Sequence, residues 1–382
     1  MIYLDNAATT YPKPPSVISA VSFAMRRYGA NPGRGGHRMS VAASRSVYET
    51  RSKLKDFFQA SDVEKVILTP GCTASLNTVI KGVLRPGDHV VISSYEHNAV
   101  WRPLEKMRQN GMATYTTAQV HDDDEETLDS FRQALNSRTR MIICTHASNV
   151  CGKILPVRRL CALAHANGVL FCLDAAQSAG ILPIDLTDDG FDYVCCAGHK
   201  GLYGPMGTGV LLINCDEQMD TLIEGGTGSA SAEASMPAYY PDRFESGTLN
   251  VPGIAGLGAG VDFVSQRGLT RIYRHELSRM RALYRQLEQN KRIHLYSPIP
   301  EEGRFVPVLS LNIEGVDCEK AAEILDQRYQ IAVRAGLHCA PLAHQSMGTL
   351  KTGTLRIAPS VFTTEEEIRK VAQALNKISY LT

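Results

Sequence analysis

Several polar side chains capable of chemistry stand just after apolar, strand-like runs of this sequence. His97 follows the run HVVISS, Asn149 follows MIICTH, and Asp174 closes VLFCLD. Lys200 follows DYVCC, inside the glycine-rich turn AGHKGLYGP. The carboxyl ends of parallel strands share one edge of a sheet, and α/β proteins bind ligands at that edge. We therefore expect these four side chains to converge on one site.

A lysine facing a carboxylate is the pair that pyridoxal phosphate requires. The amine of Lys200 would bond to the cofactor aldehyde, and Asp174 would keep the pyridine nitrogen protonated so that the ring draws off electrons. Burial near other cations would lower the pKa of such an amine. Each side chain alone has an ordinary explanation, such as a helix cap or a solvated turn. Their convergence is what favours the cofactor hypothesis.

The same cofactor needs three further contacts, and the sequence offers a candidate for each. Gln177, three residues after Asp174, can donate to the ring oxygen, and His97 can cover the ring. The segment TPGCTASLN places Thr73 where a helix begins, and a helix start binds phosphate through its backbone N–H groups. His199 is a second phosphate candidate. An ordinary capping role for Thr73 is the simpler interpretation of that segment by itself.

Composition excludes several other classes of protein. The 382 residues carry 40 Lys and Arg against 39 Asp and Glu, a net charge of +1, and 7% are aromatic. Such a balance disfavours nucleic-acid binding. No apolar run approaches the ~20 residues of a membrane span, and the N-terminus lacks a signal-peptide pattern, so we expect a cytoplasmic protein. No metal-ligand spacing is present, and we expect no bound metal.

Ten cysteines are present, and none forms a C-x-x-C motif. Most lie in apolar runs, where a cysteine behaves as a small buried hydrophobe. Cys339 differs, because it lies in the polar segment AGLHCAPLAHQ, next to His338 and near Arg334. A reactive thiol requires such exposure and nearby positive charge.

Strands alternate with helices from residue 66 to 213, which predicts a mostly parallel sheet covered by helices. The stretch 251–264 is apolar but rich in glycine, and we interpret it as a buried loop and helix start. After a long loop at 225–241, a smaller α+β unit is expected, with strands at 306–313, 331–336 and 354–359.

The order of the motifs resembles the class V aminotransferase family of pyridoxal phosphate enzymes. D-x-x-Q at 174–177 is followed by AGHKGLYGPMGTG at 197–209. The segments LDNAATT, SNVCG, RFESGTLN and RAGLHCAP narrow the resemblance to the group II cysteine desulfurases and selenocysteine lyases. It covers nearly the whole chain.

This resemblance implies fold type I, with a seven-stranded, mostly parallel sheet in a large α/β domain (15–260) and a small α+β domain (1–14 and 261–382). It implies that Lys200, Cys339 and His97 are catalytic and that the cofactor is held by Cys72, Thr73, His97, Asn149, Asp174, Gln177, His199, Lys200 and, across a dimer, Thr227. It further implies substrate contacts from His37, Asn149, Arg334 and Arg356, because arginine binds a carboxylate in bidentate fashion. The position of Cys72 in the family is commonly Thr or Ala; Ala197 and Leu337 depart from the usual Ser and His.

The implied reaction removes sulfur from L-cysteine, gives L-alanine and leaves a persulfide on Cys339. A homodimer and a sulfur-acceptor protein are the implied partners, and L-selenocysteine is a second possible substrate. Alternatives with the same cofactor are a selenocysteine lyase, a cystine lyase or an aminotransferase. A non-enzymatic alternative is a scaffold in iron–sulfur assembly, although Lys200 and Asp174 argue against it.

Overall fold

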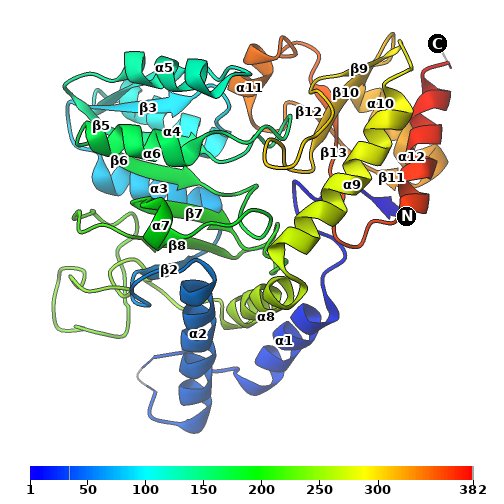
Figure 1. Cartoon of the computed structure of the whole chain (residues 1–382). Helices are drawn as coiled ribbons and strands as arrows, with labels where there is room; N and C mark the ends of the chain where they lie inside the picture. Colours follow the sequence, from blue (N-terminus) through cyan, green and yellow to red (C-terminus); the bar gives the residue numbers. More distant parts are fainter. Residues whose placement is uncertain (34, 381–382) are drawn as a thin grey trace.

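The computed structural model describes residues 1–33 and 35–380, and it contains two main sheets (Figure 1). The larger sheet has seven strands in the order β2-β8-β7-β6-β5-β3-β4. Only β8 runs against its neighbours, so the predicted mostly parallel sheet is confirmed. The strands are β2 (Val66–Thr69), β3 (Asp88–Ser93), β4 (Ala113–Ala118), β5 (Thr139–Thr145), β6 (Leu170–Asp174), β7 (Tyr193–Ala197) and β8 (Gly209–Ile213).

Helices cover both faces of this sheet because its central strands are apolar on both sides. In β5, Ile142 and Cys144 join one buried cluster, whereas Met141 and Ile143 join the other. The helices α3 (Cys72–Val83) and α4 (Asn98–Gln109) pack on the second face. The first face is covered by α2 (Arg38–Phe57), α5 (Asp124–Ala134), α6 (Val157–Ala166) and α8 (Val251–Arg267), while α1 (Pro15–Arg27) packs on α8 and the short α7 (Leu186–Asp189) precedes β7.

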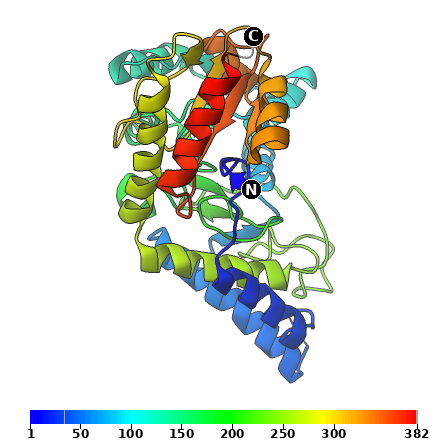
Figure 2. The same ribbon diagram turned by 90° about the vertical axis from the view of Figure 1, so that its right-hand side faces the viewer.

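The smaller sheet is antiparallel, in the order β12-β13-β10-β9. Helices pack against it (Figure 2), and a separate apolar cluster fills the space between them and the sheet. The N-terminal strand β1 (Ile2–Tyr3) pairs with β11 (Ile331–Ala332), so the N-terminal segment joins this unit. Its other elements are β9 (Ile293–Leu295), β10 (Leu309–Ile313), β12 (Arg334–Gly336), β13 (Thr354–Ile357), α9 (Leu269–Leu287), α10 (Cys318–Tyr329), α11 (Pro341–Ser346) and α12 (Glu365–Ile378).

The domain limits at residues 14 and 260 stay a prediction, and residues 381–382 of the expected small domain lie outside the described range. No helix in the described ranges is long and apolar enough to cross a membrane.

Three local expectations are wrong. The stretch 251–264 is not a loop but most of α8, whose glycines let it pack closely; a Cβ on Gly260 would lie 2.3 Å from the carbonyl oxygen of Leu202. The expected strand at 306–313 shortens to β10, and the one at 331–336 splits into β11 and β12, which belong to different sheets. In α8, the glycines therefore permit close packing of the helix. The limits of β10, β11 and β12 are set by the strands with which they pair.

The turn that carries Lys200 is held by a close backbone contact. Gly180 has a φ of +84°, and a Cβ there would lie 2.1 Å from the carbonyl oxygen of Gly201. A Cβ on Gly201 would in turn lie 2.4 Å from the carbonyl oxygen of Ala179. Only glycine permits this approach, which fixes the residue next to Lys200.

We predict that Gly180→Ala lowers the free energy of unfolding by about 2–5 kcal/mol. Left-handed backbone costs an alanine about 1–2 kcal/mol, and displacing packed backbone costs about 1–3 kcal/mol more. Gly190→Ala is the matched control, since its φ is +72° but its nearest neighbour would be 3.9 Å away. Comparing the denaturant unfolding of the two variants should separate the cost of the left-handed backbone from the cost of displacing packed backbone. Equal losses would contradict a contact-based role for Gly180.

Candidate active site

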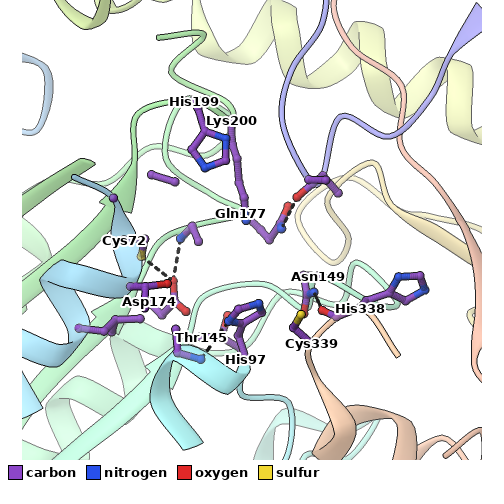
Figure 3. Close-up of a pocket in the computed structure, with 18 of the residues that line it drawn as sticks. Cys72, His97, Thr145, Asn149, Asp174, Gln177, His199, Lys200, His338 and Cys339 are labelled. Atoms are coloured by element: carbon purple, nitrogen blue, oxygen red, sulfur yellow. Dashed lines mark hydrogen bonds between the residues drawn. The ribbon is translucent and has the colours of Figure 1, made fainter. Parts of the chain in front are cut away.

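A cavity of about 640 Å³ opens where the carboxyl ends of the parallel strands face the smaller unit. Figure 3 shows side chains from both units around it. The cavity brings together all but two of the predicted site residues, namely Cys72, Thr73, His97, Asn149, Asp174, Gln177, His199, Lys200, Arg334, Cys339 and Arg356. Convergence at one sheet edge, which the sequence predicted, is therefore observed.

Asp174 and Lys200 line the cavity from the end of β6 and from the turn after the neighbouring β7. Asp174 is the last residue of β6 and is almost fully buried, at 2% exposure. Burial lowers the pKa of the Lys200 amine, and the negative charge of Asp174 opposes this effect. Lowering the pKa raises the fraction of neutral amine, which is the nucleophilic form. Gln177 lies one turn further on, and its Nε2 donates to the carbonyl oxygen of Ala7 at 3.0 Å.

His97 caps the start of α4 and presents its other ring nitrogen to the cavity. Its Nδ1 accepts the N–H of Ala99 at 3.0 Å. Burial lowers the pKa of His97 to about 4, so the ring is neutral and carries its proton on Nε2. A neutral imidazole with a fixed tautomer is suited both to stack on a flat ligand and to exchange a proton through Nε2.

Two groups on this side of the cavity are suited to an anion. The first turn of α3 leaves the N–H groups of Cys72 and Thr73 unbonded, as at any helix start, and both residues line the cavity. The Nδ1 of His199 is buried and has no hydrogen-bond partner among the described residues. An orphaned donor beside a helix N-terminus fits a phosphate. The residues present therefore fit pyridoxal phosphate at both its ring and its phosphate.

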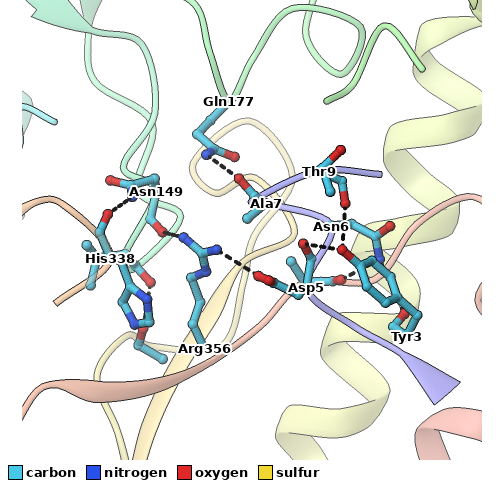
Figure 4. A network of polar contacts seen from close by, with 12 residues as sticks. Tyr3, Asp5, Asn6, Ala7, Thr9, Asn149, Gln177, His338 and Arg356 are labelled. Carbon is cyan, nitrogen blue, oxygen red and sulfur yellow. Dashed lines mark hydrogen bonds and ion pairs between the residues drawn. The ribbon is translucent and has the colours of Figure 1, made fainter. Parts of the chain in front are cut away.

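The opposite wall carries a buried arginine from β13. Arg356 is 2% exposed; its guanidinium donates to the carbonyl oxygen of Asn149 at 2.9 Å and to the Asp5 carboxylate at 3.0 Å (Figure 4). Its Nε is buried without a partner in the described chain. Burial lowers the pKa of Arg356, and the charge of Asp5 raises it. The arginine can thus offer hydrogen bonds to a carboxylate that enters the cavity.

The Cys339 loop closes the cavity from the smaller unit. The carbonyl oxygen of Cys339 accepts the N–H of Asn98 at 2.7 Å, and that of His338 accepts the Asn149 amide at 2.7 Å. His338 and Cys339 both have positive φ, at 49° and 56°. These hydrogen bonds therefore hold the backbone of the loop against α4 and against the loop that follows β5. Of the ten cysteines, Cys339 is the exposed one, which confirms that expectation.

His37 and Thr227 lie outside this cavity. His37 is exposed and caps α2, where its Nδ1 accepts the N–H of Ser40 at 3.3 Å. Thr227 lies in the long loop after β8 and contacts Ser229 at 3.0 Å between hydroxyl oxygens. The role of His37 at the substrate entrance and that of Thr227 in the cofactor site of a partner subunit remain predictions.

Sequence analysis did not identify two polar residues that support the site, Asp5 and Glu96. Asp5 is the partner of Arg356, although its motif LDNAATT had been noted. Glu96 stands directly before His97 and is fully buried; it accepts the N–H of Thr145 at 2.8 Å and the hydroxyl of Ser93. The position of Glu96 between the end of a strand and the helix-capping His97 is the sequence feature that could have identified it. Burial raises its pKa to about 8.

Comparison with known proteins agrees with this geometry. The family model "Aminotransferase class-V" matches residues 2–371. A probable cysteine desulfurase of Methanothermobacter thermautotrophicus is 33% identical over 99% of this chain and 94% of its own length. A cysteine desulfurase of Pectobacterium atrosepticum is 32% identical over 100% of this chain and 94% of its own.

Two solved structures have the same fold. The apo cysteine desulfurase of Thermococcus onnurineus NA1 superimposes with a TM-score of 0.90 at 30% identity, covering 100% of this chain and 95% of its own. The cysteine desulfurase CsdA of Escherichia coli gives 0.87 at 26% identity, with 99% and 94% covered.

Fold and site together define a fold type I α/β enzyme with a lysine at the sheet edge. The chain belongs to the class V aminotransferase family. The two relatives described above are named as a probable cysteine desulfurase and a cysteine desulfurase. The fold class expected from the sequence is confirmed.

Glu96 leads to a pH-dependent prediction. Its folded-state pKa of about 8 lies above the ordinary 4.5, so its protonated form favours folding at low pH and this contribution is lost as the pH rises from 4.5 through 8. Glu96→Gln should therefore gain stability relative to wild type across that range, by at most about 1.4 kcal/mol per pH unit. Denaturant unfolding at pH 5 and pH 8 measures it; a difference that does not grow with pH would contradict it.

Proposed function

We propose that this protein is a cysteine desulfurase that binds pyridoxal phosphate through Lys200 and transfers the sulfur of L-cysteine to Cys339. The observation that carries the proposal is that an amine with a lowered pKa and the one exposed thiol line the same cavity. A transaminase needs the lysine but no thiol at that place. Among the alternatives, the desulfurase is therefore favoured.

The cofactor, when bound, supplies an electron sink that stabilises negative charge on the substrate carbon. The residues that line the cavity would hold this cofactor. Asp174 would hold the ring nitrogen, Gln177 would donate to the ring oxygen, and His97 would cover the ring. The N–H groups at the start of α3 and the Nδ1 of His199 would hold the phosphate.

Arg356 and Asn149 hold the substrate carboxylate, and the exposed Arg334 adds positive charge at the same wall. The neutral amine of Lys200 accepts a proton from the substrate and can return it. The Sγ of Cys339 attacks the substrate sulfur; the carbon–sulfur bond breaks, its electron pair stays with the carbon, and a persulfide remains on Cys339. Protonation of the carbon gives alanine. L-Selenocysteine fits the same sites.

We also propose a homodimer. Helices α1 and α2 extend away from the sheets in both views, and they expose large apolar side chains, which a lone chain rarely does. These include Ile18 (60% exposed), Phe23 (53%), Met25 (67%), Val41 (60%) and Tyr48 (59%). His37 lies at the start of α2, so a second copy that covers these helices can bring His37 to a neighbouring cavity. The role of Thr227 in the partner's cavity is part of the same proposal. The acceptor of the persulfide sulfur and a cytoplasmic location stay predictions.

The decisive experiment incubates the pyridoxal phosphate-loaded protein with L-cysteine and measures alanine. We expect alanine from wild type and at least a hundredfold less from Cys339→Ala, which should still bind the cofactor. Lys200→Ala should yield no cofactor adduct after borohydride reduction, whereas wild type should yield one mapped to residue 200. Full turnover of cysteine by Cys339→Ala would favour the other lyases or an aminotransferase, and a wild type that binds no cofactor would favour the scaffold.

Sedimentation equilibrium tests the dimer. Wild type should have twice the chain mass, and a variant carrying both Phe23→Glu and Met25→Glu should shift toward one chain mass because charge cannot be buried unpaired at an apolar interface. Lys106→Glu, on α4, is a control of similar charge change. A monomeric wild type would exclude this proposal.

A further inference from the structure

The side chain of Cys72 lies against the carboxylate of Asp174, at the floor of the cavity (Figure 3). Its Sγ is 3.4 Å from Asp174 Oδ1 and 3.4 Å from the carbonyl oxygen of Cys195. The residue is 8% exposed. Sequence analysis placed Cys72 among the residues that hold the cofactor without giving its side chain a role, so this side-chain contact is a new feature of the site.

Cys72 acts as a donor in this position. Burial, with the negative charge of Asp174 as a smaller cause, raises the pKa of the Cys72 thiol well above its ordinary value. The thiol therefore keeps its proton, and it has one proton for two acceptors. A carboxylate accepts a hydrogen bond more strongly than a neutral carbonyl does. The proton is accordingly directed to Asp174.

The contact also fixes which carboxylate oxygen is free. Oδ1 of Asp174 accepts the N–H of Ala176 at 2.9 Å as well as the thiol. In the described part of the chain, these are the hydrogen bonds that the carboxylate of Asp174 receives, and both go to Oδ1. Oδ2 is left toward the cavity. Two donors on one oxygen hold the plane of the carboxylate in one orientation and oppose its rotation about the Cβ–Cγ bond.

We propose that Cys72 is a positioning residue for Asp174: its thiol holds Oδ1 so that Oδ2 faces the nitrogen of the cofactor ring. This inference rests on the proposed function for the cofactor and adds a residue to it. One residue at the start of α3 then serves both ends of the ligand, since its backbone N–H faces the phosphate and its side chain orients the partner of the ring.

Infrared spectroscopy of the cofactor-free protein tests the hydrogen bond itself. The S–H stretch of Cys72 is isolated by subtracting the spectrum of Cys72→Ala from that of wild type. In an Asp174→Ala background the same subtraction should place the band at higher frequency, because the charged acceptor is gone. An unchanged band would show that the thiol donates to Cys195 instead and would overturn the proposal. This measurement stands even if the protein binds no cofactor, so the two proposals fail separately.

Cofactor affinity tests the consequence. Cys72→Ala should raise the dissociation constant for pyridoxal phosphate about two- to tenfold, the range of a single hydrogen bond, and Cys72→Ser, which keeps a donor, should restore it. Cys161→Ala is the matched control, because Cys161 is also buried (1% exposed) but contacts His165 and Gly190. Equal weakening in the Ser and Ala variants would overturn the positioning role.

Discussion

The proposed chemistry of this protein depends on holding the amine of Lys200 at the edge of a sheet, largely out of water, beside the buried carboxylate of Asp174. Burial alone would expel a charged amine, so the backbone around Lys200 must be held in place against that tendency. Thr10 donates its hydroxyl to the carbonyl oxygens of His199 (3.1 Å) and Lys200 (3.2 Å), and the Lys13 amine donates to that of His199 (2.8 Å). Together with the glycine contact from residue 180, these bonds fix the turn from two sides.

The donors Thr10 and Lys13 belong to the N-terminal segment, which starts as a strand of the smaller unit. Asp5, from the same segment, holds Arg356 of β13, and Arg356 in turn holds the end of β5 through Asn149. The segment thus connects the lysine turn on one wall of the cavity with the arginine on the other. Because these hydrogen bonds link the two walls through one segment, loosening one wall weakens the polar contacts of the other.

The sheet and most of the site could be predicted from the sequence because both depend on local patterns. Apolar runs such as that of β5 and the polar residue after each strand are local signals, and parallel topology brings them to one edge. What sequence analysis missed depends on tertiary contacts. The glycines of α8 lower helix propensity, yet they permit packing that no local pattern reveals. Asp5 and Arg356 are 351 residues apart, and the role of Glu96 depends on the N–H of Thr145.

The contrast among the cysteines follows from the same principle of burial. The thiols of Cys72, Cys144 and Cys195 lie within the sheet and its first helix, and burial raises their pKa values well above the ordinary one, which keeps them protonated and unreactive. Cys339 is instead placed on a loop of the other unit, where it is exposed and its backbone is pinned by Asn98. In the proposed reaction, solvent access is then sufficient to distinguish Cys339 from the buried thiols. The buried thiol of Cys72 keeps its proton and can serve as a hydrogen-bond donor.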